Sequence, residues 1–172
     1  DYNRFTLCDY FNPHNVYTSS SGGKVFDPYN RANSASINLP VEIAGVSETP
    51  CIEFSQLNAG RAFSFKSNVW VSSNLNSYTM SSSGGSSSVS WTKLTNLTGL
   101  NIMALAIAPN NDDLIYFITD NGKFYTATLS SGSLLAINNI SLPGQSNIAA
   151  SISISTLNPD VIYVTANDKV YH

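Results

Sequence analysis

The sequence predicts an all-β protein made of about four antiparallel units, each with up to four short strands. Three observations predict this fold class. Apolar and polar residues alternate with period two, as in SISIS at residues 151–155, which is typical of strands. Short turns rich in Gly, Asn and Asp separate paired apolar runs, which favours hairpins. The same arrangement recurs along the whole chain at a nearly constant spacing, which indicates an internal repeat.

The hairpin motif occurs four times, and its spacing defines the repeat. The copies are NVYTSSSGGKVF at 15–26, RAFSFKSNVWV at 61–71, LIYFITDNGKFY at 114–125 and VIYVTANDKVY at 161–171. Their first-strand aromatic residues, Tyr17, Phe63, Tyr116 and Tyr163, lie 63 − 17 = 46, 116 − 63 = 53 and 163 − 116 = 47 residues apart. The longer interval contains MSSSGGSSSVS at 80–90, whose composition predicts a flexible Ser/Gly insertion.

Further strands complete each unit. An alternating run ending in an Asn-containing turn precedes each hairpin, in FTLCDYFNPH, CIEFSQLNAG, ALAIAPNNDD and SISISTLNPD. A fourth strand candidate follows three of the hairpins, in SASINLPVEI, SVSWTKL and SLLAINNISL. Four antiparallel strands in about 40–50 residues are typical of a β-propeller blade. We therefore expect a propeller portion over 1–172, with units at roughly 1–45, 46–98, 99–144 and 145–172.

The residues of these units resemble a known group of propellers. WTKL followed by ALAIAPNNDDLIYFITDNGKFYTAT is similar to blades of the sialidase-type (BNR, Asp-box-like), sortilin-like and xyloglucanase-like propellers. The Asp box itself is degenerate, because SSNLNSYTM and TATLSSGSLL lack its Asp. The resemblance implies a propeller fold, and it implies either a binding role or glycoside hydrolysis. Because the last unit stops within its third strand, we expect a portion of a larger propeller, with a closed four-blade ring as the alternative.

Composition limits the classes of function. Only 11% of residues are charged and the net charge is −3, so Ser, Thr, Asn and Gly supply most of the polarity. No basic stripe is present, which argues against nucleic-acid binding. No apolar run approaches the roughly 18–20 residues that span a membrane. An uncharged hydroxyl and amide surface favours an extracellular or cell-surface location.

The first strands of the first two units contain a pair of acidic residues that could be catalytic and a pair of cysteines that could form a disulfide. Asp9 and Glu53 are the catalytic candidates, because glycosidases use two carboxyl groups about 5–10 Å apart. Polar lining of a wet channel is the alternative role for both. Cys8 and Cys51 could form a disulfide or remain buried thiols. Their offsets from the turn asparagines differ by three residues, roughly 10 Å along a strand, which disfavours the bridge.

Turn residues suggest two further kinds of site. Asp112, Asp113 and Asp120 are calcium candidates, although their spacing matches no known calcium loop and turn formation explains them as well. Asn96 and Asn139 begin Asn-x-Thr/Ser sequons and are candidates for glycosylation. Two His and two Cys far apart in sequence supply no zinc ligand set, and we expect no cofactor.

Exposed aromatic rings could stack on sugars, and the candidates are Tyr2, Tyr10, Phe11, Tyr29 and Tyr78. Filling of the core is the alternative role, and it explains most aromatic residues in this fold. Three hypotheses follow. The first is a non-catalytic extracellular propeller module of a larger protein that binds a glycan or a protein. The second is a glycoside hydrolase of sialidase-like or xyloglucanase-like type. The third is a structural repeat of a surface fibre or assembly.

Overall fold

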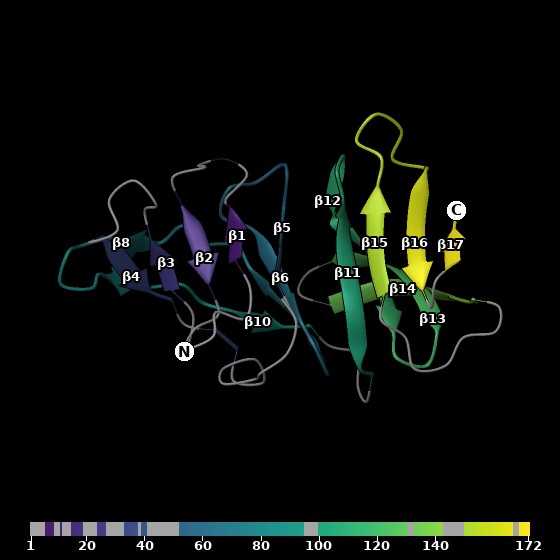
Figure 1. Cartoon of the computed structure of the whole chain (residues 1–172). Helices are drawn as coiled ribbons and strands as arrows, with labels where there is room; N and C mark the ends of the chain where they lie inside the picture. Colours follow the sequence, from purple (N-terminus) through teal and green to yellow (C-terminus); the bar gives the residue numbers. More distant parts are fainter. Residues whose placement is uncertain are drawn as a thin grey trace. The chain divides into compact units, whose positions relative to one another are not determined.

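The computed structural model contains β-strands and connecting turns (Figure 1). It describes residues 6–8, 11, 15–18, 24–26, 33–37, 39–40, 52–94, 100–130, 133–142, 150–166 and 169–172. Within these residues no helix is long and apolar enough to cross a membrane. The chain divides into two compact units, Asp1–Ser64 with Trp70–Thr92 and Phe65–Val69 with Lys93–His172.

Four antiparallel sheets repeat one order, in which the first three strands of each follow one another along the chain (Figure 1). The first sheet has the order β1 (Thr6–Cys8), β2 (Val16–Thr18), β3 (Lys24–Phe26), β4 (Ser34–Ser36). The second has the order β5 (Ile52–Phe54), β6 (Ala62–Phe65), β7 (Val69–Ser72), β10 (Thr92–Lys93). The predicted four-stranded units are therefore present.

The other two sheets follow the same plan. The third has the order β11 (Ile102–Ala108), β12 (Asn111–Thr119), β13 (Lys123–Ser130), β14 (Ser133–Ser141). The fourth has three strands, β15 (Ala150–Ile154), β16 (Ile162–Ala166), β17 (Lys169–Tyr171). A separate two-stranded sheet pairs β8 (Tyr78–Thr79) with β9 (Ser86–Ser87), so the predicted Ser/Gly insertion at 80–90 contains β9 and the turn that precedes it.

The repeat is symmetrical about one asparagine in each unit. Five residues after Asn12, Asn58, Asn111 and Asn158 stand the aromatic residues Tyr17, Phe63, Tyr116 and Tyr163. Five residues before the same asparagines stand Leu7, Glu53, Ala106 and Ser153, and each of these pairs directly with the aromatic residue of its own unit. Side chains of directly paired residues lie on one side of a sheet, so each sheet has an aromatic face, which carries these pairs, and a reverse face.

The turns that carry two of these asparagines form the same hydrogen bonds. The hydroxyl of Ser55 accepts the N–H of Asn58 at 3.0 Å, and the hydroxyl of Ser155 accepts the N–H of Asn158 at 3.1 Å. Each asparagine side chain then accepts the N–H of the residue two positions later, Gly60 or Asp160. Ser and Asn form such local bonds readily, which is why they recur at this turn.

The core lies where the aromatic face of one sheet packs on the reverse face of the next. Tyr17 of the first sheet lies against Phe54 of the second, with ring centroids 5.0 Å apart, in a cluster that includes Ile52 and Ala62. In the unit that contains the third and fourth sheets, Ile118 and Phe124 form a second cluster. It includes the reverse-face side chains of Val164 and Ala166. This packing removes the apolar side chains from water and stabilises the stacked sheets.

Candidate functional site

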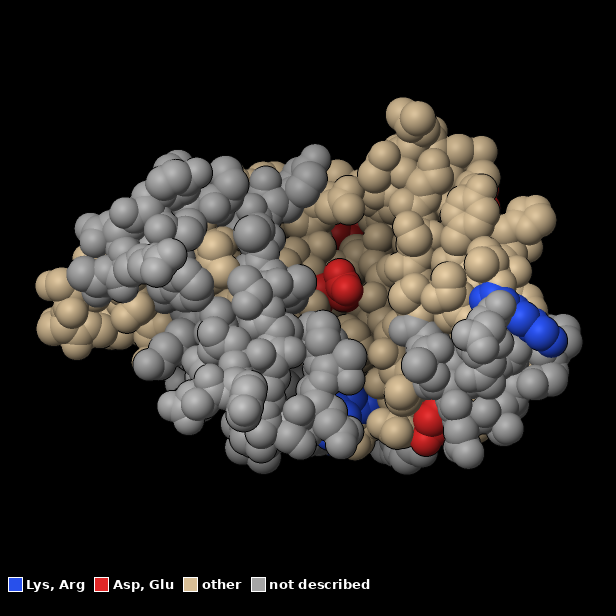
Figure 2. Space-filling view, viewed as in Figure 1, with Lys and Arg blue, Asp and Glu red and all other residues tan. Residues whose placement is uncertain are grey.

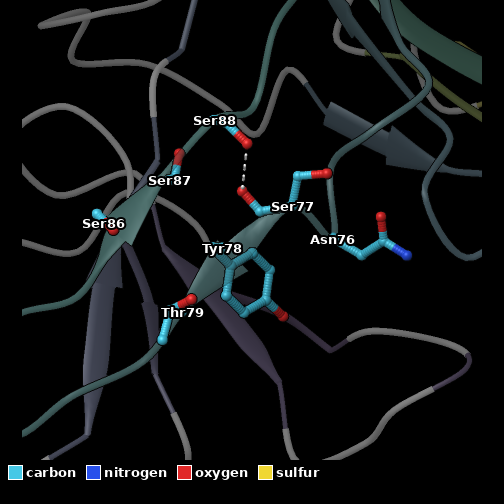
Figure 3. A pocket seen from close by; sticks show the side chains of 7 residues that line it. All are labelled: Asn76, Ser77, Tyr78, Thr79, Ser86, Ser87 and Ser88. Atoms are coloured by element: carbon cyan, nitrogen blue, oxygen red, sulfur yellow. Dashed lines mark hydrogen bonds between the residues drawn. The ribbon is translucent and has the colours of Figure 1, made fainter.

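A pocket of about 380 Å³ lies beside β8 and β9, and its walls are uncharged and polar (Figure 3). One wall is formed by the segment that enters and forms β8, and the other by β9 and the residue after it. Ser88 faces Ser77 across the pocket in Figure 3, and its hydroxyl donates to the Ser77 carbonyl at 3.4 Å. The lining residues are Asn76, Ser77, Tyr78, Thr79, Ser86, Ser87 and Ser88.

The β8–β9 hairpin that carries this pocket is docked on the first sheet. Ser34 of β4 exchanges two backbone hydrogen bonds with Ser81, at 3.1 and 3.2 Å, and its carbonyl also accepts the N–H of Gly85 at 2.7 Å. The turn between the two hairpin strands includes Gly84, whose φ of 88° is a left-handed conformation that favours glycine. The Ser/Gly composition thus serves a tight turn and a close backbone approach, and the flexibility of the 80–90 segment stays a prediction.

Asn74 holds the base of the hairpin from one side. Its side-chain oxygen accepts the N–H and the hydroxyl of Ser90, at 2.9 and 3.2 Å, and its side-chain nitrogen donates to the Ser88 carbonyl at 3.0 Å. The Ser88 N–H in turn donates to the Ser77 carbonyl at 2.9 Å. These bonds fix the two walls of the pocket relative to each other.

Tyr78 joins the pocket to the core. Its ring contacts Tyr17 edge-on, with centroids 6.3 Å apart, and the two hydroxyl groups lie 3.2 Å apart in a hydrogen bond. The ring is also partly buried against the first core cluster. Tyr78 is one of the five aromatic residues that the sequence indicated as sugar-stacking candidates. Phe11 is exposed, and Tyr2, Tyr10 and Tyr29 lie outside the described residues.

The lining of this pocket can bind neutral, hydroxylated molecules. Hydroxyl and amide groups donate and accept hydrogen bonds alike, and an aromatic ring supplies an apolar surface beside them. None of the seven lining residues carries a charge. Figure 2 shows that Lys, Arg, Asp and Glu are also sparse over the described parts of the viewed surface, in agreement with the charged fraction of 11%.

Glu53 occupies the position in β5 that directly opposes Phe63. The side chain is exposed, yet the surrounding protein displaces enough water from the carboxyl group to raise its pKa to about 7. The other catalytic candidate, Asp9, lies outside the described residues, so the pair of carboxyl groups stays a prediction.

The remaining candidates are dispersed. Asp112 and Asp113 lie at the start of β12, where the Asp113 N–H donates to the Asn111 side chain, and Asp120 accepts from Asn101 in the turn after β12. Within the described residues no three His, Cys, Asp or Glu side chains converge as a metal site requires.

Asn139 is exposed on β14, and Cys8 lies in β1. Asn96 and Cys51 lie outside the described residues, so both sequons and the disulfide stay predictions.

Sequence reasoning missed most of this pocket. Asn76, Ser77, Thr79 and the serines of β9 were absent from the candidate sites, because a low-complexity Ser/Gly segment shows no period-two pattern. The available signal was the pair of glycines at 84 and 85, flanked by short serine runs, which is a hairpin turn signature as well as a linker signature.

Comparisons with solved structures establish the architecture. An ancestral GH74 enzyme matches 98% of this chain over 22% of its own length, with a TM-score of 0.68 and 14% identity. An auxiliary nutrient binding protein from Bacteroides thetaiotaomicron matches 95% of the chain over 36% of its length, with a TM-score of 0.63 and 13% identity. The chain has a β-propeller fold. This confirms the predicted fold class.

A third similar structure is the beta-propeller domain of Myceliophteria thermophila Cps50 (Swd1). It matches 91% of this chain over 46% of its own length, with a TM-score of 0.57 and 12% identity. The propeller chain therefore spans less than half the length of each of these three structures. No family model and no curated protein sequence matches it. The similarity supports a propeller in general, and it does not single out the sialidase-type or sortilin-like group.

The hairpin geometry makes Gly85 essential for the pocket. A Cβ atom at this position would lie 1.6 Å from the Thr79 carbonyl oxygen, so Gly85→Ala must separate β8 from β9. We expect a loss of about 1–3 kcal/mol in the free energy of unfolding, or about 2–4 °C in Tm per kcal/mol. Thermal denaturation followed by circular dichroism measures this. Ser82→Ala, on an exposed turn residue, is the control, and equal Tm values for the two variants would contradict the assignment.

The raised pKa of Glu53 should make the folded protein less stable as pH rises. Its pKa is raised from 4.5 to about 7, so between these values the folded state binds more protons than the unfolded state. The stability contributed by this carboxyl group therefore falls as pH rises through that window. We expect Tm of the wild type, relative to Glu53→Gln, to decrease from pH 4 to pH 8. Asp112→Asn is the control, and a difference that stays constant with pH would exclude the raised pKa.

Proposed function

We propose that this chain is a non-catalytic, extracellular β-propeller module that binds a neutral glycan in the pocket beside β8 and β9. The observation that carries the proposal is the lining, which consists of seven hydroxyl, amide and phenol side chains without a charge. A neutral sugar presents many hydroxyl groups, and a pocket with convergent donors and acceptors matches this pattern. The nutrient binding protein with a similar fold supports a binding role for a propeller of this kind.

The fixed geometry of the pocket supports the same proposal. Pre-formed sites lose less conformational entropy when a ligand binds. Here Asn74 and the bonds between Ser34 and the hairpin hold the pocket walls before any ligand arrives. The partly buried ring of Tyr78 is fixed by its contact with Tyr17, so its exposed portion offers a rigid apolar surface.

A glycan array of neutral and anionic oligosaccharides, followed by calorimetry with the best neutral sugar, tests this function. Thr79→Ala and Ser86→Ala each remove one exposed hydroxyl from the pocket lining. We expect each to weaken binding by about 2–10-fold, the worth of one hydrogen bond. Ser82→Ala, which lies outside the lining, should bind like the wild type. An array with no neutral ligand, or Thr79→Ala and Ser86→Ala variants that bind normally, would refute the proposed site.

The extracellular part of the proposal predicts glycosylation at Asn139. This sequon asparagine is exposed on β14, opposite Tyr125, where an attached glycan would extend into solvent. We expect protein secreted from a eukaryotic host to lose mass on treatment with a peptide N-glycosidase. Asn139→Gln should remove the part of that shift due to this site. A wild-type tryptic peptide with entirely unmodified Asn139 would contradict the prediction.

Glycoside hydrolysis is the second candidate, and one observation favours it. A carboxyl group whose pKa lies near 7 is protonated to a useful extent at neutral pH, as a general acid must be. Glu53 would then donate a proton to the leaving group, with Asp9 as its partner. A hydrolysis screen with Glu53→Gln and Asp9→Asn separates the two functions, because a binding module hydrolyses none of the sugars that it binds.

A further inference from the structure

The turn that joins β12 to β13 contains the dipeptide Asn121–Gly122, and the asparagine side chain is exposed. Gly122 has a φ of 77°, a left-handed conformation that favours glycine. Because glycine has no side chain to shield its backbone nitrogen, this nitrogen can reach the side-chain carbon of a preceding asparagine. The turn therefore places an amide group next to an internal nucleophile.

One buried residue, Thr119, holds both of the groups that would react. Its backbone carbonyl accepts the N–H of Gly122 at 2.9 Å. Its hydroxyl donates to the side-chain oxygen of Asn121 at 2.7 Å, and the Lys123 carbonyl lies 3.2 Å from the same hydroxyl. Thr119 is 0% exposed at the end of β12, so its position is fixed by the sheet. We call the bonds from Thr119 to Gly122 and to Asn121 the Thr119 latch.

Further hydrogen bonds hold the chain on both sides of the latch. The carbonyl of Gly122 accepts the N–H of Leu142 at 3.2 Å. The N–H of Asp120 donates to the Asn101 carbonyl at 2.9 Å, and the Asp120 side chain accepts from the Asn101 side chain at 3.2 Å. In the closed hairpin, nitrogen and amide are thus each engaged elsewhere, and they can meet only when the latch opens.

We propose that Asn121 is a site of slow, spontaneous deamidation and that the Thr119 latch sets its rate. When the latch opens, hydroxide removes the proton of the Gly122 N–H, and the nitrogen bonds to the side-chain carbon of Asn121. The bond from this carbon to the amide nitrogen breaks, and ammonia leaves after taking a proton from water. Water then adds to either carbonyl carbon of the succinimide ring, which opens to an aspartyl or an isoaspartyl residue.

The reaction changes the turn permanently. Either product replaces a neutral amide by a carboxylate next to Asp120, and the two like charges repel each other. The isoaspartyl product also adds one carbon atom to the main chain before Gly122, so the Gly122–Thr119 bond no longer closes a turn of normal length. This site lies in the compact unit of the third and fourth sheets, and it does not depend on the proposed glycan pocket.

Incubation of the folded protein in heavy-oxygen water at mildly alkaline pH, followed by peptide mapping, tests the proposal. We expect solvent oxygen to enter at Asn121 and not at Asn158, because Pro159 has no N–H to react. The unfolded reference is the peptide acetyl-Thr-Asp-Asn-Gly-Lys-amide, which copies residues 119–123. The folded protein should react about tenfold more slowly than this peptide, because both bonds of the latch must open first.

Variants identify the latch as the cause. Thr119→Val removes the hydroxyl at nearly constant volume and frees the Asn121 side chain, so it should speed deamidation about 3–10-fold, the worth of one hydrogen bond. Thr119→Ser keeps the hydroxyl and should react at the wild-type rate. Thr128→Val, on an exposed residue of β13 outside the turn, is the matched control. Gly85→Ala, which weakens the other compact unit, controls for a general loss of stability.

Hydrogen exchange of the Gly122 N–H in the wild type measures the same opening without any variant. Its protection factor should equal the retardation of deamidation relative to the peptide, within about threefold. If Thr119→Val does not fold, this comparison decides, and a clear mismatch overturns the latch. The proposal is also overturned by an unreacted Asn121 after the peptide has been consumed many times over, or by equal rates in Thr119→Val and Thr128→Val. Equal acceleration in Gly85→Ala would overturn it as well, by assigning the reaction to global unfolding.

Discussion

The covering of one sheet face by the next is the constraint on which the rest of this structure depends. A short antiparallel sheet with an apolar face is not stable alone in water, and it becomes stable when another sheet covers that face. Two contacts illustrate this packing. The ring of Tyr17 lies against Phe54, and Phe124 shares a buried cluster with Val164. Of the aromatic residues five positions after the turn asparagine, Tyr17 and Phe63 are buried, whereas Tyr163 is exposed.

The asparagine turn makes this packing reproducible. It closes the first two strands of a unit in one register, with Ser55 and Asn58 or Ser155 and Asn158 in the same hydrogen bonds. A shift by one residue would exchange the two faces and place Tyr17 or Phe63 on the wrong side. Local hydrogen bonding and long-range packing thus favour the same register, which is the consistency expected of a chain that folds to one structure.

This consistency explains which features could be predicted from the sequence. Period-two alternation predicts the strands, and Gly, Asn and Asp between the strands predict the turns. Residues 114–125 and 161–171 carry both patterns, so their hairpins could be predicted from the sequence alone. The pocket beside β8 and β9 is different, because it depends on contacts between distant backbone atoms. The approach of Gly85 to Thr79 and the bonds of Ser34 with Ser81 leave no pattern in a serine-rich segment. The Glu53 pKa likewise depends on the surrounding protein, which no single-sequence pattern reveals.

Each candidate site in this propeller is a departure from the repeat at a position where the backbone stays the same. Glu53 takes the place that Leu7, Ala106 and Ser153 hold in the other units, and the ladder is unchanged. The β8–β9 insertion lengthens one unit without altering the order of its sheet. Because the stacked sheets tolerate such changes, comparing equivalent positions within one chain locates its chemistry even when similarity to other proteins establishes only the fold.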